Sequence, residues 1–187
     1  MARGNADLSR WVVDELGVHR PAGGRIVELG PGPGVGLQHA LQTFPHANVW
    51  GIDLSPEMIS QARGRNRAAV HEGRLKLIIG GVEQLGAIAP IDIVFANHVL
   101  YFWHEPTREL ETIRGSIAAG GMLALGYQLN QNMPPMAQKY FPRDGHLLYR
   151  SDDQVDAVIR AAGFVDIEHR VKGSPDAPEG RLALATV

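Results

Sequence analysis

The sequence has no cysteine among its 187 residues, and only 6% of them are aromatic. Without cysteine the chain cannot form disulfide bonds, thiolate metal sites or a cysteine nucleophile. Histidines at a metal-binding spacing, such as His-x-x-x-His, are missing as well, so we expect no metal. These absences exclude several classes of enzyme.

Long apolar runs are also missing. No stretch approaches the roughly 20 apolar residues that cross a bilayer, and charged side chains interrupt residues 1–18, so a signal-peptide core is lacking. The formal charge is -2 and the pI is about 6.4, which gives no general attraction to a nucleic-acid backbone or an anionic membrane. We therefore expect a cytoplasmic protein that binds neither nucleic acid nor membranes.

The chain is the length of one globular domain, and its 44% hydrophobic content is enough for a sizeable core, so residues 1–187 are expected to form a single domain. Short apolar or β-branched runs bounded by turn residues predict strands at 25–29, 49–52, 75–79, 91–96, 122–127, 165–170 and 182–186. Helical spacing of apolar residues predicts helices within 1–20 and at 37–44, 56–62, 106–117 and 151–162.

Strands that alternate with helices predict a doubly wound α/β fold, because parallel neighbours need crossover connections. The last two predicted strands have only a loop between them, so the final strand should run antiparallel. The sequence thus predicts a seven-stranded, mainly parallel sheet with helices on both faces, in three α/β/α layers.

A glycine-rich turn lies between the first strand and its helix, and it reads Glu-Leu-Gly-Pro-Gly-Pro-Gly-Val-Gly at 28–36. Glycine lets a ligand approach the backbone closely, although such a turn can also serve only to pack a strand against a helix. The next strand ends in Asp53, roughly 20 residues further on, where a carboxylate can hold both hydroxyls of a ribose. Together they indicate a nucleoside-containing ligand.

Four segments resemble one known family, the class I (Rossmann-like) S-adenosylmethionine (SAM)-dependent methyltransferases. They are the glycine-rich turn at 28–34, Gly-Ile-Asp-Leu-Ser-Pro-Glu-Met at 51–58, Asp-Ile-Val-Phe-Ala-Asn-His-Val-Leu at 92–100, and Gly-Gly-Met-Leu at 120–123. The resemblance implies an enzyme that transfers a methyl group from SAM to an acceptor and releases S-adenosylhomocysteine. We expect the acceptor to be a small molecule.

The resemblance also implies positions for the cofactor. Glycines of the turn would face the methionine part of SAM, Asp53 the ribose, and Leu54 and Met58 the surroundings of the adenine. After the third strand many members carry an acid that binds adenine, whereas this chain has Gly80-Gly81-Val82-Glu83, so backbone near Val82, Glu83 or shape would hold the ring. The expected cofactor-binding residues are Glu28, Gly30, Pro31, Gly32, Gly34, Asp53, Leu54, Met58, Gly81, Val82, Glu83, Asn97 and His98.

Two other functions fit parts of the pattern. Gly30 and Gly32 also begin the Gly-x-Gly-x-x-Gly fingerprint of nicotinamide-dependent oxidoreductases, but the third glycine of that spacing falls on Val35, and two prolines remove backbone donors for a pyrophosphate. A non-catalytic module that binds SAM or a nucleoside is the second alternative.

His98 is the candidate catalytic residue, because it follows the fourth strand where the ligand crevice of such a sheet opens. A histidine near neutral pKa can take a proton from a hydroxyl or ammonium acceptor. A purely structural role, as a backbone cap, fits the position equally well. His104 and His146 are weaker candidates.

The segment 128–150 is long for a loop and rich in Met, Pro and aromatic residues. Loops of this length in compact domains are usually functional, so we expect a substrate lid, although the loop could instead cover its own hydrophobic cluster. The expected substrate-facing residues are Tyr101, Trp103, Met133, Met136, Tyr140 and Phe141.

Overall fold

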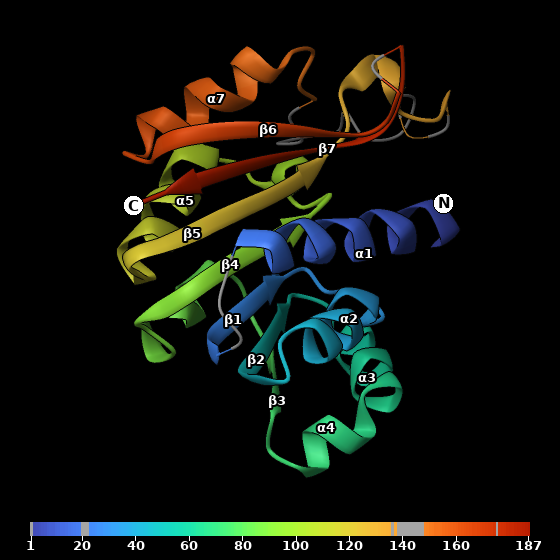
Figure 1. Ribbon diagram of the computed structural model, residues 1–187, viewed down its shortest axis with the longest axis vertical. Coiled ribbons are helices and arrows are strands. Elements are labelled where there is room, and N and C mark those ends of the chain that lie inside the picture. Colours follow the sequence, from blue (N-terminus) through green and yellow to red (C-terminus); the bar gives the residue numbers. More distant parts are fainter. Residues whose placement is uncertain (1, 20–22, 136, 138–147, 175) are drawn as a thin grey trace.

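The computed structural model of the chain describes residues 2–19, 23–135, 137, 148–174 and 176–187 (Figure 1). Within these residues seven strands form one sheet, in the order β3-β2-β1-β4-β5-β7-β6. The strands are β1 (Gly23–Leu29), β2 (His46–Asp53), β3 (Leu75–Ile79), β4 (Ile91–Asn97), β5 (Ile117–Tyr127), β6 (Val165–Ser174) and β7 (Ala177–Thr186).

The strand directions agree with the prediction. Strands β1 to β5 pair in parallel, and β7 pairs antiparallel with both β5 and β6. In Figure 1 the connection between β6 and β7 lies on the same side of the sheet as the arrowheads of β1 and β5. The antiparallel strand therefore begins at the edge where the parallel strands end.

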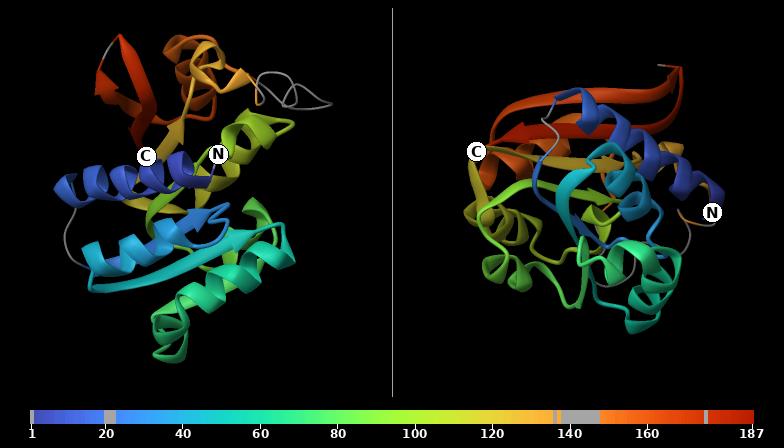
Figure 2. Two further views of the ribbon diagram at one scale, coloured as in Figure 1. Left: turned by 90° about the vertical axis from the view of Figure 1, so that its right-hand side faces the viewer. Right: turned by 60° about the horizontal axis from the view of Figure 1, so that its bottom comes forward.

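Helices cover both faces of the sheet, which confirms the three-layer α/β/α architecture. On one face lie α1 (Ala2–His19), α2 (Val35–Thr43) and α3 (Pro56–Arg65), followed by the short α4 (Arg67–His71). The 3-10 helix η1 (Val82–Ala87), α5 (Pro106–Ser116) and α7 (Asp152–Ala161) lie on the other. Figure 2 shows the helices of residues 2–71 grouped together, away from α7.

Each face of the sheet has its own hydrophobic core, because each helix turns its apolar stripe toward the strands. Leu8, Val12 and Leu16 of α1 are fully buried in the first core. The second contains Leu110 of α5 and Val155 of α7. The sheet is thus held from both sides, and its carboxyl edge remains as the place for a site.

The structure corrects two details of the sequence prediction. Ile117 was expected on the buried face of the helix that begins at Pro106, but its backbone is extended and it pairs with Ile91, so it begins β5. Ser151 with Gln154 three residues later predicts a capping box, and Ser151 does cap α7 by accepting from Gln154 N at 3.4 Å. The Gln154 side chain, however, accepts from Arg150 N at 2.7 Å and does not reach back to Ser151.

Two further 3-10 turns follow the ends of strands, η2 (Leu100–Phe102) after β4 and η3 (Asn130–Asn132) after β5. Both stand at the carboxyl edge of the sheet. In the described residues no helix is both long and apolar enough to cross a membrane.

Candidate active site

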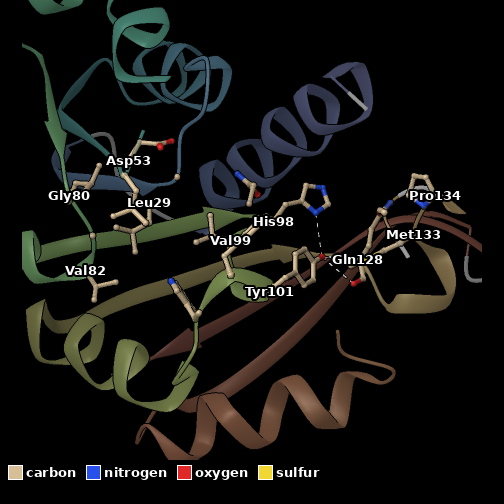
Figure 3. Close-up of a pocket in the computed structure, with 18 of the residues that line it drawn as sticks. Leu29, Asp53, Gly80, Val82, His98, Val99, Tyr101, Gln128, Met133 and Pro134 are labelled. Carbon is tan, nitrogen blue, oxygen red and sulfur yellow. Dashed lines mark hydrogen bonds between the residues drawn. The ribbon is translucent and has the colours of Figure 1, made fainter. Parts of the chain in front are cut away.

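A cavity of about 600 Å³ opens at the carboxyl ends of the parallel strands. Figure 3 shows its walls, which come from the turns after β1, β2, β3, β4 and β5. The described residues that line it are Leu29, Gly30, Ile52, Asp53, Leu54, Gly80, Gly81, Val82, Asn97, His98, Val99, Tyr101, Phe102, Trp103, Gln128, Met133, Pro134, Ala137 and Glu179.

The glycine-rich turn forms one wall. Gly30, Gly32 and Gly34 have left-handed backbones, with φ of 64°, 51° and 80°. A Cβ at Gly30 would lie only 2.5 Å from Cγ2 of Val99, so the turn packs closely against the residues after β4. Only glycine combines this conformation with this approach.

Asp53 is held in place by the backbone of two turns. Its Oδ2 accepts from Gly32 N at 3.1 Å and its Oδ1 from Ser55 N at 2.9 Å. An ionised carboxylate has about four acceptor positions, so roughly two remain for a ligand. The side chain thus faces the cavity in a fixed orientation with free capacity to accept hydrogen bonds.

Asn97 lines the cavity, and the buried carboxyl group of Glu28 lies behind it. Glu28 Oε2 and both polar atoms of the Asn97 side chain are buried without a well-aligned hydrogen bond among the described residues, although the two side chains lie close enough to interact. Burial raises the pKa of Glu28 to about 8. Because buried polar atoms are normally paired, these atoms suit a site that a polar or cationic ligand completes.

His98 directly follows β4 and has a left-handed backbone, with φ of 57°. Its amide donates to Gly126 O at 2.8 Å, which ties the residue to β5. A strained conformation of this kind in a non-glycine residue is frequent at functional sites. Burial lowers the pKa of His98 to about 4, so the ring is neutral at neutral pH but is a weaker base than the near-neutral histidine expected from the sequence.

The turn after β3 forms the far end of the cavity. Gly81 and Val82 line it, whereas the Glu83 carboxylate accepts from Gly81 N at 2.8 Å. This bond to the Gly81 amide lowers the pKa of Glu83. The acid therefore caps its own turn, and the lining there consists of backbone and apolar side chains.

Comparison with known proteins agrees with this geometry. Residues 27–123 match the family described as "Methyltransferase domain". An uncharacterized methyltransferase of Bacillus subtilis, YdaC, is 30% identical over 174 residues, which are 92% of this chain and 87% of that protein. The chain belongs to the methyltransferase domain family.

The methyltransferase is also 33% identical to a trans-aconitate 2-methyltransferase of Methylobacterium nodulans. The match covers 59% of the present chain and 40% of the Methylobacterium protein.

Solved structures show the same fold. The methyltransferase superposes on an O-methyltransferase family protein from Burkholderia thailandensis with a TM-score of 0.73 and 19% identity, over 97% of its own length and 56% of that chain. It therefore spans about two fifths of the Methylobacterium relative and about half of this structure. The predicted class of SAM-dependent methyltransferase is confirmed, in preference to the nicotinamide-dependent oxidoreductase.

The cavity of the methyltransferase includes many of the residues predicted from the sequence. The predicted residues that line it are Gly30, Asp53, Leu54, Gly81, Val82, Asn97, His98, Tyr101, Trp103 and Met133. Those outside the lining are Glu28, Pro31, Gly32, Gly34, Met58 and Glu83. Met136, Tyr140, Phe141 and His146 lie outside the described residues, as does the rest of 138–147 in the expected lid.

Several lining residues of the methyltransferase were not predicted. Phe102 directly follows the predicted residue Tyr101, and Gln128 directly follows the end of β5. These positions in the sequence could have indicated that both residues lie at the site. Glu179 comes from β7, far along the chain. The antiparallel direction of that strand was the available clue, since its first residues must lie at the carboxyl edge.

Proposed function

We propose that the chain methylates a small, uncharged acceptor, and that SAM and the acceptor share the one cavity at the carboxyl edge. The main support is that this cavity joins the glycine-rich turn and Asp53 at one end to His98 and aromatic side chains at the other. Its volume of about 600 Å³ is within the usual range for small-molecule sites.

The residues present fit SAM. Gly30 leaves its backbone accessible, Asp53 has spare acceptor capacity for the ribose hydroxyls, and the buried polar atoms of Asn97 suit the methionine end. Leu54 and Val82 would contact the adenine. When bound, SAM supplies an electrophilic methyl group on a positively charged sulfur. Methyl transfer is an in-line displacement, so alignment and exclusion of water contribute most of the catalysis.

His98 is the proposed base. Its ring lines the cavity and is neutral at neutral pH, so it can take a proton from an acceptor hydroxyl. Tyr101, Trp103 and Met133 would contact the acceptor, with Met136, Tyr140 and Phe141 in the proposed lid of residues 128–150. Glu28, which burial keeps protonated at neutral pH, would lie behind the methionine end of SAM as a polar group.

The charge of the lining favours an uncharged acceptor. Among the described lining residues the charged side chains are Asp53, assigned to the ribose, and Glu179, which forms an ion pair with Lys172. Gln128 and His98 add neutral hydrogen-bonding groups. A carboxylate acceptor is the second candidate, because trans-aconitate 2-methyltransferases are among the relatives.

We further propose that residues 1–187 act as a single cytoplasmic domain, with the helix of residues 1–20 beside the site and no nucleic acid as partner. The neutral-to-acidic composition supports this assignment.

Calorimetry tests cofactor binding. SAM should bind, and Asp53→Ala should weaken binding by about 1.5 to 3 kcal/mol, the range for hydrogen bonds to a charged group. Asp153→Ala, at an exposed carboxylate in the first turn of α7, is the matched control and should bind SAM like the wild type. Equal affinity in all three proteins would contradict the proposed ribose contact.

Methylation assays test the acceptor class. Purified protein is incubated with SAM and a panel of phenols, amines and carboxylic acids, including trans-aconitate, and S-adenosylhomocysteine release is measured. Turnover of phenols or of aromatic amines, which are uncharged at neutral pH, is expected. Turnover confined to the carboxylic acids would favour the second candidate, and SAM binding without turnover of any acceptor would favour the non-catalytic module.

A further inference from the structure

Among the described residues the hydroxyl of Tyr101 has three hydrogen-bond contacts, all of them with Gln128 and His98. Its ring is fully buried in the 3-10 turn after β4. The oxygen contacts the backbone N of Gln128, the carbonyl O of Gln128 at 3.1 Å, and Nδ1 of His98 at 3.4 Å (Figure 3). The hydroxyl thus joins the end of β5 to the histidine of the site.

The roles of these three partners follow from their chemistry. A tyrosine hydroxyl has one proton to donate and two lone pairs that accept. The amide of Gln128 can only donate, so it occupies one lone pair, and the carbonyl can only accept, so it takes the hydroxyl proton. One lone pair remains for Nδ1 of His98. This nitrogen donates to that lone pair when it carries the proton of the imidazole.

A neutral imidazole has a single N–H, so a proton on Nδ1 leaves Nε2 with a free lone pair. Within the described part of the chain nothing forms a hydrogen bond to Nε2. His98 itself lines the cavity. In this tautomer Nε2 is the nitrogen that can accept a proton, and the Tyr101 hydroxyl contacts only Nδ1.

We propose that Tyr101 is a positioning residue that fixes the tautomer and orientation of His98, so that Nε2 takes the proton of the acceptor. The inference rests on the proposed function. Tyr101 does not itself exchange a proton in this step, because its hydroxyl stays bonded to the Gln128 carbonyl.

The O–H or N–H bond of the acceptor breaks and its proton moves to Nε2, while the electron pair stays on the acceptor atom. That atom forms the new bond to the methyl carbon, and the carbon–sulfur bond breaks with its electron pair on sulfur. His98 leaves the step as an imidazolium with Nδ1–H still bonded to Tyr101, and it then loses the added proton to water.

The surroundings of His98 support a neutral ring in one orientation. Its amide is bonded to Gly126 O, so the backbone is fixed on one side and the ring on the other. The other titratable groups that line the cavity within the described residues are Asp53, Tyr101 and Glu179. Asp53 is bonded to Gly32 and Ser55, and Glu179 is paired with Lys172, so neither carboxylate competes for Nδ1.

Nuclear magnetic resonance of protein with ¹⁵N-labelled histidine tests the tautomer without any turnover. His98→Asn identifies the His98 signals, and asparagine tolerates the left-handed backbone there. At neutral pH the wild type should show a protonated Nδ1 and an unprotonated Nε2. Tyr101→Phe should show a mixture of tautomers. A protonated Nε2 in the wild type, or an unchanged single tautomer in Tyr101→Phe, would overturn the proposal.

Kinetics with an acceptor that turns over provide the second test. Loss of a general base lowers kcat by about 100-fold or more, and Tyr101→Phe should lower it by about tenfold, with the SAM Kd unchanged. In a His98→Asn background, Tyr101→Phe should have no further effect, since it acts through the histidine. Additive losses in the double variant would mean that Tyr101 acts independently and would contradict the inference.

Tyr127→Phe is the matched control. Tyr127 is also buried with a hydrogen-bonded hydroxyl, but that hydroxyl contacts Asp152 and His169 and the residue does not line the cavity. Its removal should change neither the His98 signals nor kcat. A failure of the proposed function would appear separately, as absent SAM binding in calorimetry, and would leave the tautomer measurement intact.

Discussion

At the scale of single residues, Glu28 has an unusual environment for a carboxyl group. It is 1% exposed at the end of β1, and a Cβ at Gly36 would lie 2.2 Å from its Oε1. Burial raises its pKa from 4.5 to about 8. The folded protein therefore keeps this group protonated at neutral pH, whereas the unfolded chain ionises it.

This difference predicts how stability depends on pH. Between pH 4.5 and 8 the native state binds a proton that the unfolded state lacks, so the contribution of Glu28 to the free energy of unfolding falls as pH rises through that range. Glu28→Gln keeps the shape without the ionisation. Urea unfolding at pH 5, 7 and 9 should show a smaller decline in the variant than in the wild type.

Glu57→Gln, at an exposed position in the first turn of α3, is the control and should follow the wild type at every pH. Parallel stability curves for the wild type and Glu28→Gln would mean that Glu28 ionises alike in both states. SAM is left out of these measurements, because a cation bound near the site would favour the ionised form.

Single residues were predictable where a strand end fixes their place. Asp53 and His98 follow β2 and β4 directly, so the α/β pattern was enough to bring them to one edge of the sheet. Glu83 was less predictable, because its carboxylate bonds to the backbone two residues away. Such a local bond competes with ligand binding and leaves no periodic signal in the sequence.

At the scale of elements, the segment after β5 contributes an apolar wall. Met133 follows the 3-10 turn η3, is 6% exposed and lines the cavity. Leu129 and Tyr149, near the two ends of the expected lid, are buried in the core beside it. The described ends of this segment are thus anchored in the fold.

Met133→Ala should raise the KM of the acceptor several-fold and leave the SAM Kd unchanged, since the glycine-rich turn and Asp53 stay intact. Met122→Ala is a matched control, because Met122 is also 6% exposed but packs in the core on the opposite face of the sheet. Both substitutions should cost about 2 to 5 kcal/mol of stability. A KM shift of equal size in the two variants would point to general destabilisation.

Elements were predicted more accurately in position than in length. The strand at 75–79 agrees with its predicted bounds, whereas β6 and β7 extend toward each other as far as Ser174 and Ala177. The polar and glycine residues of these two extensions show no alternating strand pattern in the sequence. They are extended because β6 and β7 pair with each other there. This longer hairpin is what brings Glu179 to the cavity.

At the scale of the whole molecule, the cavity is lined from both ends of the chain. Gly30 and Asp53 belong to the first third, and Gln128 and Glu179 to the last. The layers and strand order followed from the alternation of strands and helices, but the volume and shape of the cavity depend on side-chain packing, which no sequence pattern encodes.

A ligand held between such distant segments should stabilise the entire fold. SAM at 100 times its Kd adds about 2.7 kcal/mol to the free energy of unfolding. For a domain of this size each kcal/mol raises Tm by about 2 to 4 °C. Thermal unfolding with SAM should therefore shift upward by roughly 5 to 11 °C at that concentration, and NADH should give no shift. A larger shift with NADH would contradict the assigned cofactor.

The strand order also bears on how the protein is made. Because β7 lies between β5 and β6, the earlier strand β6 has no hydrogen-bonding partner in the sheet until the later one arrives. During synthesis β6 leaves the ribosome first, with both of its edges unpaired, and unpaired edges are where chains aggregate. Strands β1 to β5 can assemble meanwhile, whereas the last third of the sheet waits for residues 177–186. A nascent chain released before that point would expose one edge of β5 and both edges of β6 at once, which makes it a natural target for chaperones.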